Sequence, residues 1–269
     1  MAPRTRDGIS MTATPPDRPI GTERDIPRLN EQLEGWPAED ILAWAWATLG
    51  PDVAVSSSFQ TQSVPLLYLV SQVCPEMPVI FIDTGFHFPE TLAFRDELQA
   101  RYNLNIVVAR PAIEKSQMLQ QYGEGLYRRD PDLCCYLHKV EPMQRAIAGL
   151  RGWISGVRRD QTAHRATLRV IEAQPGRPLK IHPLLNWTRR DLWRFINAHD
   201  LPAHPLFAQG YLSVGCAPCT RPVTPGEDER AGRWAGADKT ECGLHVNLID
   251  PSADGQERLE REDGRTAER

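Results

Sequence analysis

The stretch VAVSSSFQTQSV, residues 53–64, is typical of a buried strand that turns directly into a helix. Its apolar half is short and rich in valine, which favours a strand. Three serines follow, and hydroxyls and backbone N–H groups at a helix start can hold a phosphate group. The stretch has neither the glycines nor the GK[ST] sequence of a Walker A loop. The simpler interpretation is a polar turn whose serines only cap the helix.

The alternation of strand and helix continues after this stretch. The apolar run VIFID, residues 79–83, precedes FPETLAFRDELQARYN, in which Pro89 marks a helix start. NIVVAR, residues 105–110, is a further buried strand. Repeated strand–helix units predict an α/β fold with a mostly parallel sheet and helices on both faces.

Two later segments extend the sheet. WISGVR, residues 153–158, is predicted to be a strand. LKIHPLL, residues 179–185, is expected at an edge, because Pro183 cannot donate to a hydrogen-bond ladder. Thr188 then begins a helix, with Asp191 in its first turn.

The chain divides into four parts by composition. Residues 1–25 and 251–269 are rich in charge and poor in apolar residues, so both are expected to be disordered tails. Residues 26–205 are expected to form the nucleotide-binding α/β domain. Residues 206–250 lose regular patterning and are expected to lie over the finished sheet as loops and short helices.

Composition narrows the class of protein. The 269 residues carry a net charge of −4 with both signs interspersed, so nucleic acid is not an expected partner. No run is long and apolar enough to suggest a signal peptide or a membrane span. The sequence therefore predicts a cytoplasmic protein with no membrane association.

The six cysteines are expected to be ligands or nucleophiles rather than disulfides in a reducing compartment. Cys74 is the exception, because its apolar surroundings predict an inert core thiol. Cys216 and Cys219 have the spacing of two thiolates that converge on one metal centre, and the adjacent Cys134 and Cys135 add two more. Four thiolates suit Zn²⁺ or a [4Fe–4S] cluster, and spacing alone does not choose. A redox dithiol remains a further interpretation of the CxxC pair.

Cys242 has a different setting. Lys239 lies three residues before it and His245 three residues after it, so cations can lower the pKa of its thiol and favour a nucleophilic thiolate. Gly243 allows close approach of a substrate. An exposed surface thiol is the plainer alternative.

Other polar residues lie where a ligand is expected. Asp83 and Thr84 follow a strand at the carboxyl edge, where open α/β sheets bind ligands. Arg158 follows another strand, and Arg230 and Arg233, three residues apart, would share a face if their segment were helical. Arginine binds phosphate or sulfate oxygens with two N–H groups.

Six segments, in this order, carry a family resemblance: SSSFQTQS, FIDTGFHFPET, DPDLCCYLHK, SGVRRDQ, GCAPCTRP and KTECGLH. Together they closely resemble the assimilatory adenylyl-sulfate reductases, relatives of the phosphoadenylyl-sulfate reductases. The resemblance covers about residues 52–245, and the cysteine arrangement makes it specific. It implies an adenine nucleotide α-hydrolase-like, Rossmann-like fold with a C-terminal segment that carries the catalytic cysteine.

The resemblance also implies roles for the site residues. One [4Fe–4S] cluster per chain is expected on Cys134, Cys135, Cys216 and Cys219, so that both adjacent cysteines bind one cluster. Cys242 is expected to be the nucleophile. The remaining residues are expected to bind substrate: Ser57, Ser58, Lys139, Arg158, Arg230, Arg233 and His245.

The implied reaction is reduction of adenosine 5′-phosphosulfate to sulfite and AMP. The thiolate attacks the sulfur to give an S-sulfocysteine, and thioredoxin or a similar dithiol carrier then releases sulfite. A homo-oligomer is possible.

Three alternatives compete with this interpretation. A 3′-phosphoadenylyl-sulfate reductase usually lacks the four cluster cysteines, although dual specificity remains open. An ATP pyrophosphatase of the same fold is disfavoured, because SSSFQTQS replaces its SGGxDS loop. A zinc-stabilised nucleotide-binding module explains four thiolates but leaves Cys242 without a role.

Overall fold

A computed structural model describes residues 25–234, 239, 241, 243 and 244. Six strands form one sheet in the order β3-β2-β1-β4-β6-β5. The strands are β1 (Val53–Ser56), β2 (Pro78–Ile82), β3 (Asn105–Ala109), β4 (Gly152–Ser155), β5 (Ile171–Glu172) and β6 (Leu179–Ile181). All neighbouring strands are parallel except β5 and β6, which are antiparallel. The predicted α/β class with a mostly parallel sheet is confirmed.

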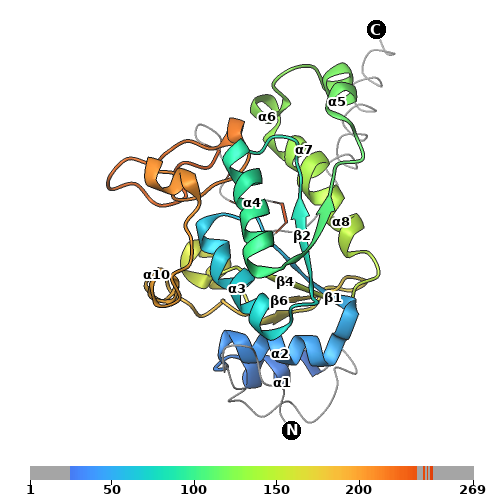
Figure 1. The fold of residues 1–269 in the computed structure, drawn as a ribbon. Coiled ribbons are helices and arrows are strands. Elements are labelled where there is room, and N and C mark those ends of the chain that lie inside the picture. The colour runs from blue at the N-terminus through green and yellow to red at the C-terminus, as the bar shows by residue number, and fades with distance from the viewer. Residues whose placement is uncertain (1–24, 235–238, 240, 242, 245–269) are drawn as a thin grey trace.

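Helices connect and cover the strands (Figure 1). The α-helices are α1 (Ile26–Leu33), α2 (Ala38–Leu49), α3 (Val64–Val73), α4 (Pro89–Tyr102), α5 (Lys115–Tyr122), α6 (Leu126–Arg129), α7 (Pro131–Cys135), α8 (Glu141–Ile147), α9 (Ala163–Ala166) and α10 (Arg189–Ala198). Short 3₁₀ turns are η2 (Gly50–Asp52), η3 (Thr61–Ser63), η5 (Arg159–Gln161), η6 (Pro205–Gln209) and η7 (Ala217–Cys219), and η4 (Tyr136–Val140) is a π-helix. No helix in these residues is long and apolar enough to cross a membrane.

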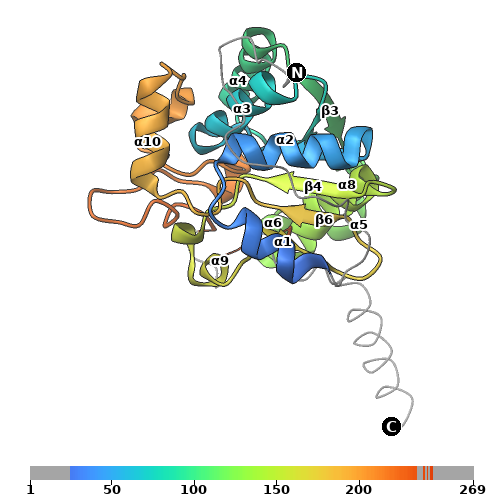
Figure 2. The same ribbon diagram turned by 90° about the horizontal axis from the view of Figure 1, so that it is seen from below.

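Alternation along the strands separates two apolar layers. Val53 and Val55 of β1 face the larger core, which includes residues of α2, α3, α4 and α10. Ala54 faces a smaller core with Met143 and Ile147 of α8. Viewed from below, α2 and α3 lie on one side of β4 and β6 (Figure 2). The central strands β1 and β4 are therefore covered on both faces. The prediction that residues 105–110 form a buried strand was wrong, because β3 lies at the edge of the sheet and Val107 is 45% exposed.

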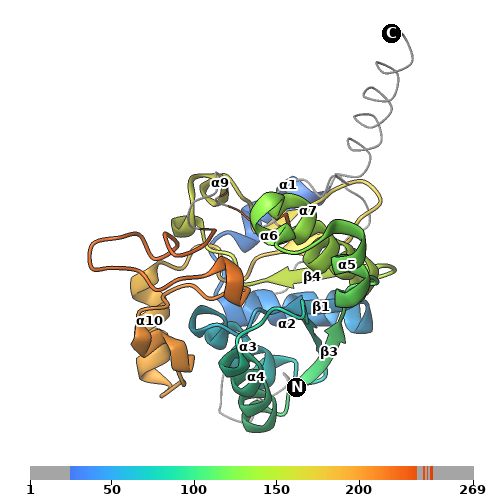
Figure 3. The ribbon, with the colours of Figure 1, turned by 90° about the horizontal axis from the view of Figure 1, so that it is seen from above.

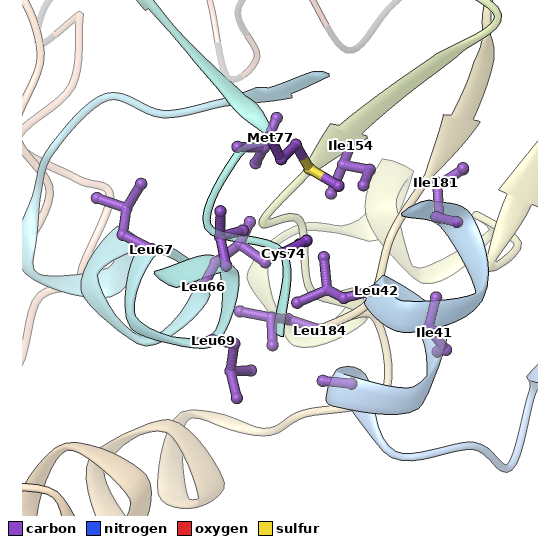
Figure 4. Close-up of a cluster of buried hydrophobic side chains, with 14 of the residues drawn as sticks. Ile41, Leu42, Leu66, Leu67, Leu69, Cys74, Met77, Ile154, Ile181 and Leu184 are labelled. Atoms are coloured by element: carbon purple, nitrogen blue, oxygen red, sulfur yellow. The ribbon is translucent and has the colours of Figure 1, made fainter. Parts of the chain in front are cut away.

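The larger core also contains Cys74. Its side chain lies among Leu42, Leu66 and Met77 (Figure 4) and is 1% exposed. Burial raises the pKa of the Cys74 thiol to about 12. The structure thus confirms the prediction that Cys74 is a core thiol.

The edge of the sheet corrects one prediction. The segment around Leu179–Ile181 is not an edge strand, because β5 pairs with its outer side. β5 contains only two residues, which is too short for a sequence pattern to reveal. The strand β6 nevertheless stops before Pro183, as the missing N–H of proline requires.

The carboxyl ends of the strands form the edge that matters for function. β1 lies between β2 and β4, and the chain continues to β2 and β3 on one side and to β4 and β6 on the other. Such a switch point leaves a crevice above the strand ends. Seen from above, the segment with α5, α6 and α7 and the segment after α10 both lie near these ends (Figure 3).

The central strand pair offers a stability test. A Cβ atom added at Gly152 would lie 2.5 Å from Leu49 Cδ1 and 2.9 Å from Val53 Cγ2, so Gly152→Ala overpacks the core. The variant is expected to lower the free energy of unfolding by about 1–3 kcal/mol. Gly35→Ala is the matched control, because a Cβ there has nothing within 4 Å. Urea unfolding measures both, and equal midpoints for the two variants would contradict the packing argument.

Candidate active site

A pocket opens at the switch point, above the ends of β1, β2 and β4. We call it the switch-point pocket; its lining includes Ser57, Ser58, His87, Lys139, Ser155, Arg165, Arg230, Arg233 and Trp234. The predicted residues Ser57, Ser58, Lys139, Arg230 and Arg233 are therefore brought together. They come from segments far apart in the sequence.

The serine turn has a defined shape. Ser57 N–H donates to Ile80 O at 3.1 Å, and Ser57 Oγ accepts from Phe59 N–H at 3.1 Å. Phe59 has φ of 53°, a left-handed conformation that costs a non-glycine residue about 1–3 kcal/mol. Its ring is fully buried against Phe81, with centroids 5.5 Å apart, which holds the turn in place. The serines thus line the pocket on a turn that is anchored from below.

Two buried donors face this pocket without an acceptor in the described residues. They are Arg233 Nε and Trp234 Nε1. Buried N–H groups are rarely left unpaired, and a ligand oxygen is one way to satisfy them. The Arg233 guanidinium also packs against the backbone, because a Cβ at Gly215 would come within 2.4 Å of its Nη2. The pocket is therefore built to receive an acceptor, and the charge of Arg233 favours an anionic one.

His87 contributes a hydrogen-bond acceptor to the pocket, in contrast to the donors of Arg233 and Trp234. Its Nε2 lies 2.8 Å from Ile82 O, so Nε2–H donates to this carbonyl and Nδ1 is left as an acceptor. Burial lowers the pKa of His87, so the ring is neutral at pH 7. Nδ1 is buried and has no hydrogen-bond partner in the described chain. The histidine is available to accept a hydrogen bond from a ligand.

Arg158 lies behind the pocket rather than in its lining. Its side chain is 1% exposed, and its Nε donates to Asp160 Oδ1 at 3.0 Å. Its Nη1 donates to Gln62 Oε1 at 3.1 Å, and its Nη2 lies 3.8 Å from Glu229 Oε1. These contacts tie the helix after the serine turn to the end of β4. The structure places this predicted substrate ligand in a supporting position.

Arg165 lines the pocket, and sequence reasoning did not single it out. Its guanidinium makes two charge-assisted hydrogen bonds to Glu241, from Nε to Oε1 and from Nη2 to Oε2, both at 2.8 Å. Thr162 Oγ1 donates to the same carboxylate at 2.7 Å, and Arg230 Nη2 lies 3.7 Å from it. Both residues stand next to segments that the sequence analysis singled out, since Arg165 follows SGVRRDQ closely and Glu241 precedes Cys242. No local sequence pattern indicates that the two residues form an ion pair.

The predicted residues Cys242 and His245 lie outside the described residues, as do residues 1–24 of the predicted tail 1–25 and the whole predicted tail 251–269. Their neighbours are placed. Glu241 is 8% exposed and bound to Arg165, while Leu244 lines the switch-point pocket. Covalent bonds to Glu241 and Gly243 keep Cys242 within one residue of both, because consecutive Cα atoms are about 3.8 Å apart.

The four predicted metal ligands line a second, smaller cavity. We call it the cysteine cavity; Cys134, Cys135, Cys216 and Cys219 all contribute to its wall. Within the described residues, no three Cys, His, Asp or Glu side chains lie close enough to hold one metal ion. Four cysteine side chains are the donor set of both a structural zinc site and a [4Fe–4S] cluster.

The surroundings of the four cysteines shift the pKa values of their thiols in different directions. Burial, followed by the negative charges of the other thiolates, raises the pKa of Cys134 to about 12. The same causes raise the pKa of Cys219 to about 11. Burial alone would also raise the pKa of Cys216, but the Lys139 charge and the hydrogen bond from Thr84 outweigh it and lower that pKa. At neutral pH Cys134 and Cys219 are therefore protonated thiols, and a metal centre bound there would require their deprotonation.

Lys139 connects the two cavities, since it lines both. It belongs to the π-helix η4, which follows α7 directly. Such π-turns occur mostly at functional sites. A second link is Thr84, whose Oγ1 lies 3.4 Å from Cys216 Sγ and which also lines the switch-point pocket. A charge or ligand in one cavity is thus felt in the other.

Comparison with known proteins is consistent with this geometry. The family description "Phosphoadenosine phosphosulfate reductase domain" matches residues 52–222. A protein from Streptomyces coelicolor named adenosine 5′-phosphosulfate reductase is 43% identical over 219 residues, which cover 81% of this chain and 92% of that protein. One from Gloeobacter violaceus named phosphoadenosine 5′-phosphosulfate reductase is 42% identical over 225 residues, which cover 82% and 93%.

A solved structure is also similar. It is the phosphoadenylyl-sulfate reductase from Candida auris in a phosphate complex, with a TM-score of 0.65 and 29% identity, covering 73% of this chain and 96% of that one. The match and the strand order confirm the predicted nucleotide α-hydrolase-like fold.

The ion pair between Arg165 and Glu241 yields a prediction for Cys242. Burial opposes ionisation of Glu241, but the hydrogen bonds and charge of Arg165 hold the pKa of this carboxyl below 4.5. The stabilisation is therefore fully present above pH 4.5 and is lost as pH falls through the lower folded-state pKa. Glu241→Gln is expected to lower the free energy of unfolding by about 1–3 kcal/mol and to speed alkylation of native Cys242 several-fold.

Alkylation is measured with iodoacetamide at neutral pH, followed by peptide mapping. The matched control is Glu227→Gln, which removes an exposed carboxylate that binds Arg221. This control is expected to leave the alkylation rate of Cys242 unchanged. Equal rates for Glu241→Gln and the unmodified sequence would show that the ion pair does not position the segment.

Proposed function

The chain belongs to the phosphoadenosine phosphosulfate reductase family, and from this premise we propose that it reduces adenosine 5′-phosphosulfate to sulfite and AMP in sulfate assimilation. The observation that carries the proposal is the switch-point pocket with its unpaired Arg233 Nε and Trp234 Nε1 donors beside a cavity lined by four cysteines. The first feature suits a phosphosulfate group, and the second suits a cluster. Relatives with the corresponding name support the substrate.

In the first stage, the Cys242 thiolate attacks the sulfur of the substrate in line with the leaving phosphate. The new bond joins Cys242 Sγ to the sulfonate sulfur, and the bond between sulfur and the bridging oxygen breaks. Both electrons of the broken bond stay with the phosphate, so AMP leaves and S-sulfocysteine remains. Negative charge grows on the phosphate oxygens, where positioned donors are most effective.

Three cationic side chains are assigned to that charge. Arg233 and Arg230 line the pocket directly, and Lys139 lines it from the side of the cysteine cavity. Arg158 supports them indirectly, because its buried guanidinium fixes Gln62 and Asp160. Arg165 is assigned to Glu241 and so to the placement of the neighbouring Cys242.

The neutral side chains are assigned to the nucleotide. Ser57 and Ser58 lie where a strand end meets a helix, and their hydroxyls line the pocket. His245, three residues beyond the nucleophile, is assigned to the substrate as well. The helix that follows the serine turn adds the partial positive charge of its N-terminus.

In the second stage, thioredoxin or a similar dithiol carrier regenerates the thiol. One thiolate of the carrier attacks Cys242 Sγ, which forms a mixed disulfide and releases sulfite with the bonding electrons. The second carrier thiol then attacks the mixed disulfide, so the carrier ends oxidised and Cys242 ends reduced. Such an exchange suits the cytoplasm, where thiols stay reduced. We also expect a homo-oligomer.

One [4Fe–4S] cluster per chain is assigned to Cys134, Cys135, Cys216 and Cys219. These side chains line one cavity, and a bound metal centre would displace the protons that the raised pKa values keep on Cys134 and Cys219. When bound, the cluster supplies charge that organises the site and is not assigned a role as electron carrier. Lys139 lines both the cysteine cavity and the switch-point pocket, so its positive charge would act on both sites.

Two alternatives to the proposed function can be distinguished from it by experiment. A 3′-phosphoadenylyl-sulfate reductase, or an enzyme that accepts both nucleotides, is favoured by the relative from Gloeobacter violaceus with that name. Its identity to this chain is nearly that of the relative from Streptomyces coelicolor, so identity alone does not choose between the substrates. A zinc-stabilised nucleotide-binding module is the alternative without catalysis.

The reaction predicts a stable covalent intermediate on Cys242. Anaerobic incubation with adenosine 5′-phosphosulfate, without a dithiol, is expected to add one sulfonate to this residue and to release AMP. The 3′-phosphorylated substrate is expected to add little. Intact mass and peptide mapping measure both, with Cys242→Ser as the control that takes no label. Equal labelling would indicate dual specificity, and no label from either compound would overturn the reductase proposal.

The metal assignment predicts a composition. Protein purified without oxygen is expected to hold about four irons and a similar amount of acid-labile sulfide per chain, with broad visible absorbance. Cys135→Ser is expected to lose most of the iron, whereas Cys74→Ser should retain it, because Cys74 lies in the apolar core. One zinc per chain in colourless protein would favour the binding module instead.

A further inference from the structure

A chain of hydrogen bonds runs from the switch-point pocket into the sheet edge. Ser155 lines the pocket, and its Oγ lies 2.9 Å from His182 Nδ1. The other ring nitrogen, His182 Nε2, lies 3.4 Å from Glu172 Oε2. The mechanism proposed above uses none of these three residues. Ser155 and His182 are both nearly fully buried, at 5% and 2% exposed.

Strand register brings the three residues together. Ile154 of β4 pairs with Ile181 of β6, so the next residues, Ser155 and His182, lie side by side at the carboxyl edge. β5 runs antiparallel on the other side of β6, and His182 N–H donates to Val170 O at 2.9 Å. Glu172 therefore reaches the far side of the imidazole ring. The arrangement follows from the strand β5 that sequence reasoning missed.

The surroundings of Glu172 and His182 determine the protonation states of these two side chains. Burial opposes ionisation of Glu172, but its hydrogen bond with His182, with Lys180 nearby, keeps the pKa of this carboxyl below its usual value. Burial lowers the pKa of His182, although Glu172 opposes that effect and Lys180 and Arg165 add to it. At neutral pH the carboxylate is ionised and the imidazole carries one proton.

The direction of each hydrogen bond follows from these states. An ionised carboxylate only accepts, so His182 Nε2 carries the proton and donates to Glu172. His182 Nδ1 is then a bare acceptor, and the Ser155 hydroxyl must donate to it. The lone pairs of Ser155 Oγ are left for the pocket. The serine presents an acceptor, and not a donor, to whatever occupies the pocket.

We propose that Ser155, oriented by His182 and Glu172, is a specificity residue that accepts a hydrogen bond from an N–H or O–H donor of the bound nucleotide. The proposal rests on the proposed function, since it takes the ligand to be an adenosine nucleotide. Such a ligand offers two kinds of donor, the 6-amino group of the base and the hydroxyls of the ribose. A site with a fixed acceptor discriminates against analogues that lack the matching donor.

His87 makes the assignment sharper. Its Nδ1 is a second buried acceptor in the pocket, and it follows β2 whereas Ser155 ends β4. β1 lies between these two strands. Two acceptors on opposite sides of the central strand contact different parts of one nucleotide. Loss of Ser155 should therefore remove the preference for one donor and leave any preference for the other.

A catalytic interpretation of the same three residues is less favoured. Serine, histidine and a carboxylate form the triad of many hydrolases, in which the serine is a nucleophile. In the proposed reaction the electrophile is sulfur and Cys242 attacks it, so the serine has no bond to form. A nucleotidyl adduct on Ser155 in the intact mass spectrum, after incubation with the substrate, would overturn the binding role.

The test measures affinity and needs no turnover. Calorimetric titration of anaerobically purified protein compares AMP with three analogues: IMP, which lacks the 6-amino group, 2′-deoxy-AMP and 3′-deoxy-AMP. One of these analogues is expected to bind the unmodified protein about tenfold more weakly than AMP. Ser155→Ala is expected to bind AMP about tenfold more weakly and to bind that analogue as well as AMP. The analogue that loses its penalty identifies the donor.

Two further variants complete the design. Ser71→Ala is the matched control, because Ser71 Oγ donates to Tyr68 O on α3 and does not line the pocket; all four affinities should be unchanged. Glu172→Gln keeps the shape of the side chain at this position but removes its negative charge. The proton of His182 is then no longer fixed on Nε2, so Ser155 is no longer held as an acceptor. It is expected to lose part of the preference between AMP and the identified analogue, and it provides the test if Ser155→Ala does not fold.

The outcomes separate the two proposals. If Ser155→Ala changes all four affinities by the same factor, or none of them, the specificity role is wrong while the reductase proposal stands. If Glu172→Gln shows the same preference between AMP and the identified analogue as the unmodified protein, His182 and Glu172 do not orient the serine. The proposal then fails in that form. If folded, unmodified protein binds no AMP, both proposals fail.

Discussion

The parallel pairing of β1 with β4 is the constraint on which the rest of the structure depends. The register Ser56 to Ser155 places both strand ends at the same level, and the chain leaves them in opposite directions. The crevice is therefore a consequence of topology and exists before any side chain is specified. The described residues that line this crevice come from strand ends or from segments laid over them. The close packing of Gly152 against Leu49 and Val53 keeps the two strands in this register.

Buried charge is distributed around that crevice in two ways. Arg158 and Arg165 are matched by carboxylates, from Asp160 and Glu229 in one case and from Glu241 in the other. In such a pair the attraction between the two charges offsets part of the cost of removing them from water, and loss of one partner leaves the other buried and uncompensated. Arg233 differs from these two arginines, since its Nε is buried without an acceptor in the described residues. The paired arginines hold the frame, and the unpaired donor marks where a ligand oxygen belongs.

The sequence predicted those features that are expressed locally. The run Val53–Ser56 and the strands after it have continuous apolar character, so the parallel sheet and its covered faces followed directly. The cysteine spacing gave four residues that the structure places around one cavity. Features that arise from pairing across the fold were missed. β5 has only two residues, and the partnership of Arg165 with Glu241 joins positions 76 residues apart. The π-helix that carries Lys139 has no sequence signature that separates it from an α-helix.

Adjacency of Cys134 and Cys135 makes physical sense at the end of α7. Neighbouring residues on an α-helix point about 100° apart, so two adjacent thiols can contact one object only if it is wide and lies in the arc between them. In the structure both thiols line one cavity together with Cys216 and Cys219. The next turn widens into the π-helix and directs Lys139 toward both the cysteines and the switch-point pocket. The unusual cysteine pair and the unusual helix are therefore parts of one arrangement, which places the positive charge of Lys139 beside both the four cysteines and the switch-point pocket.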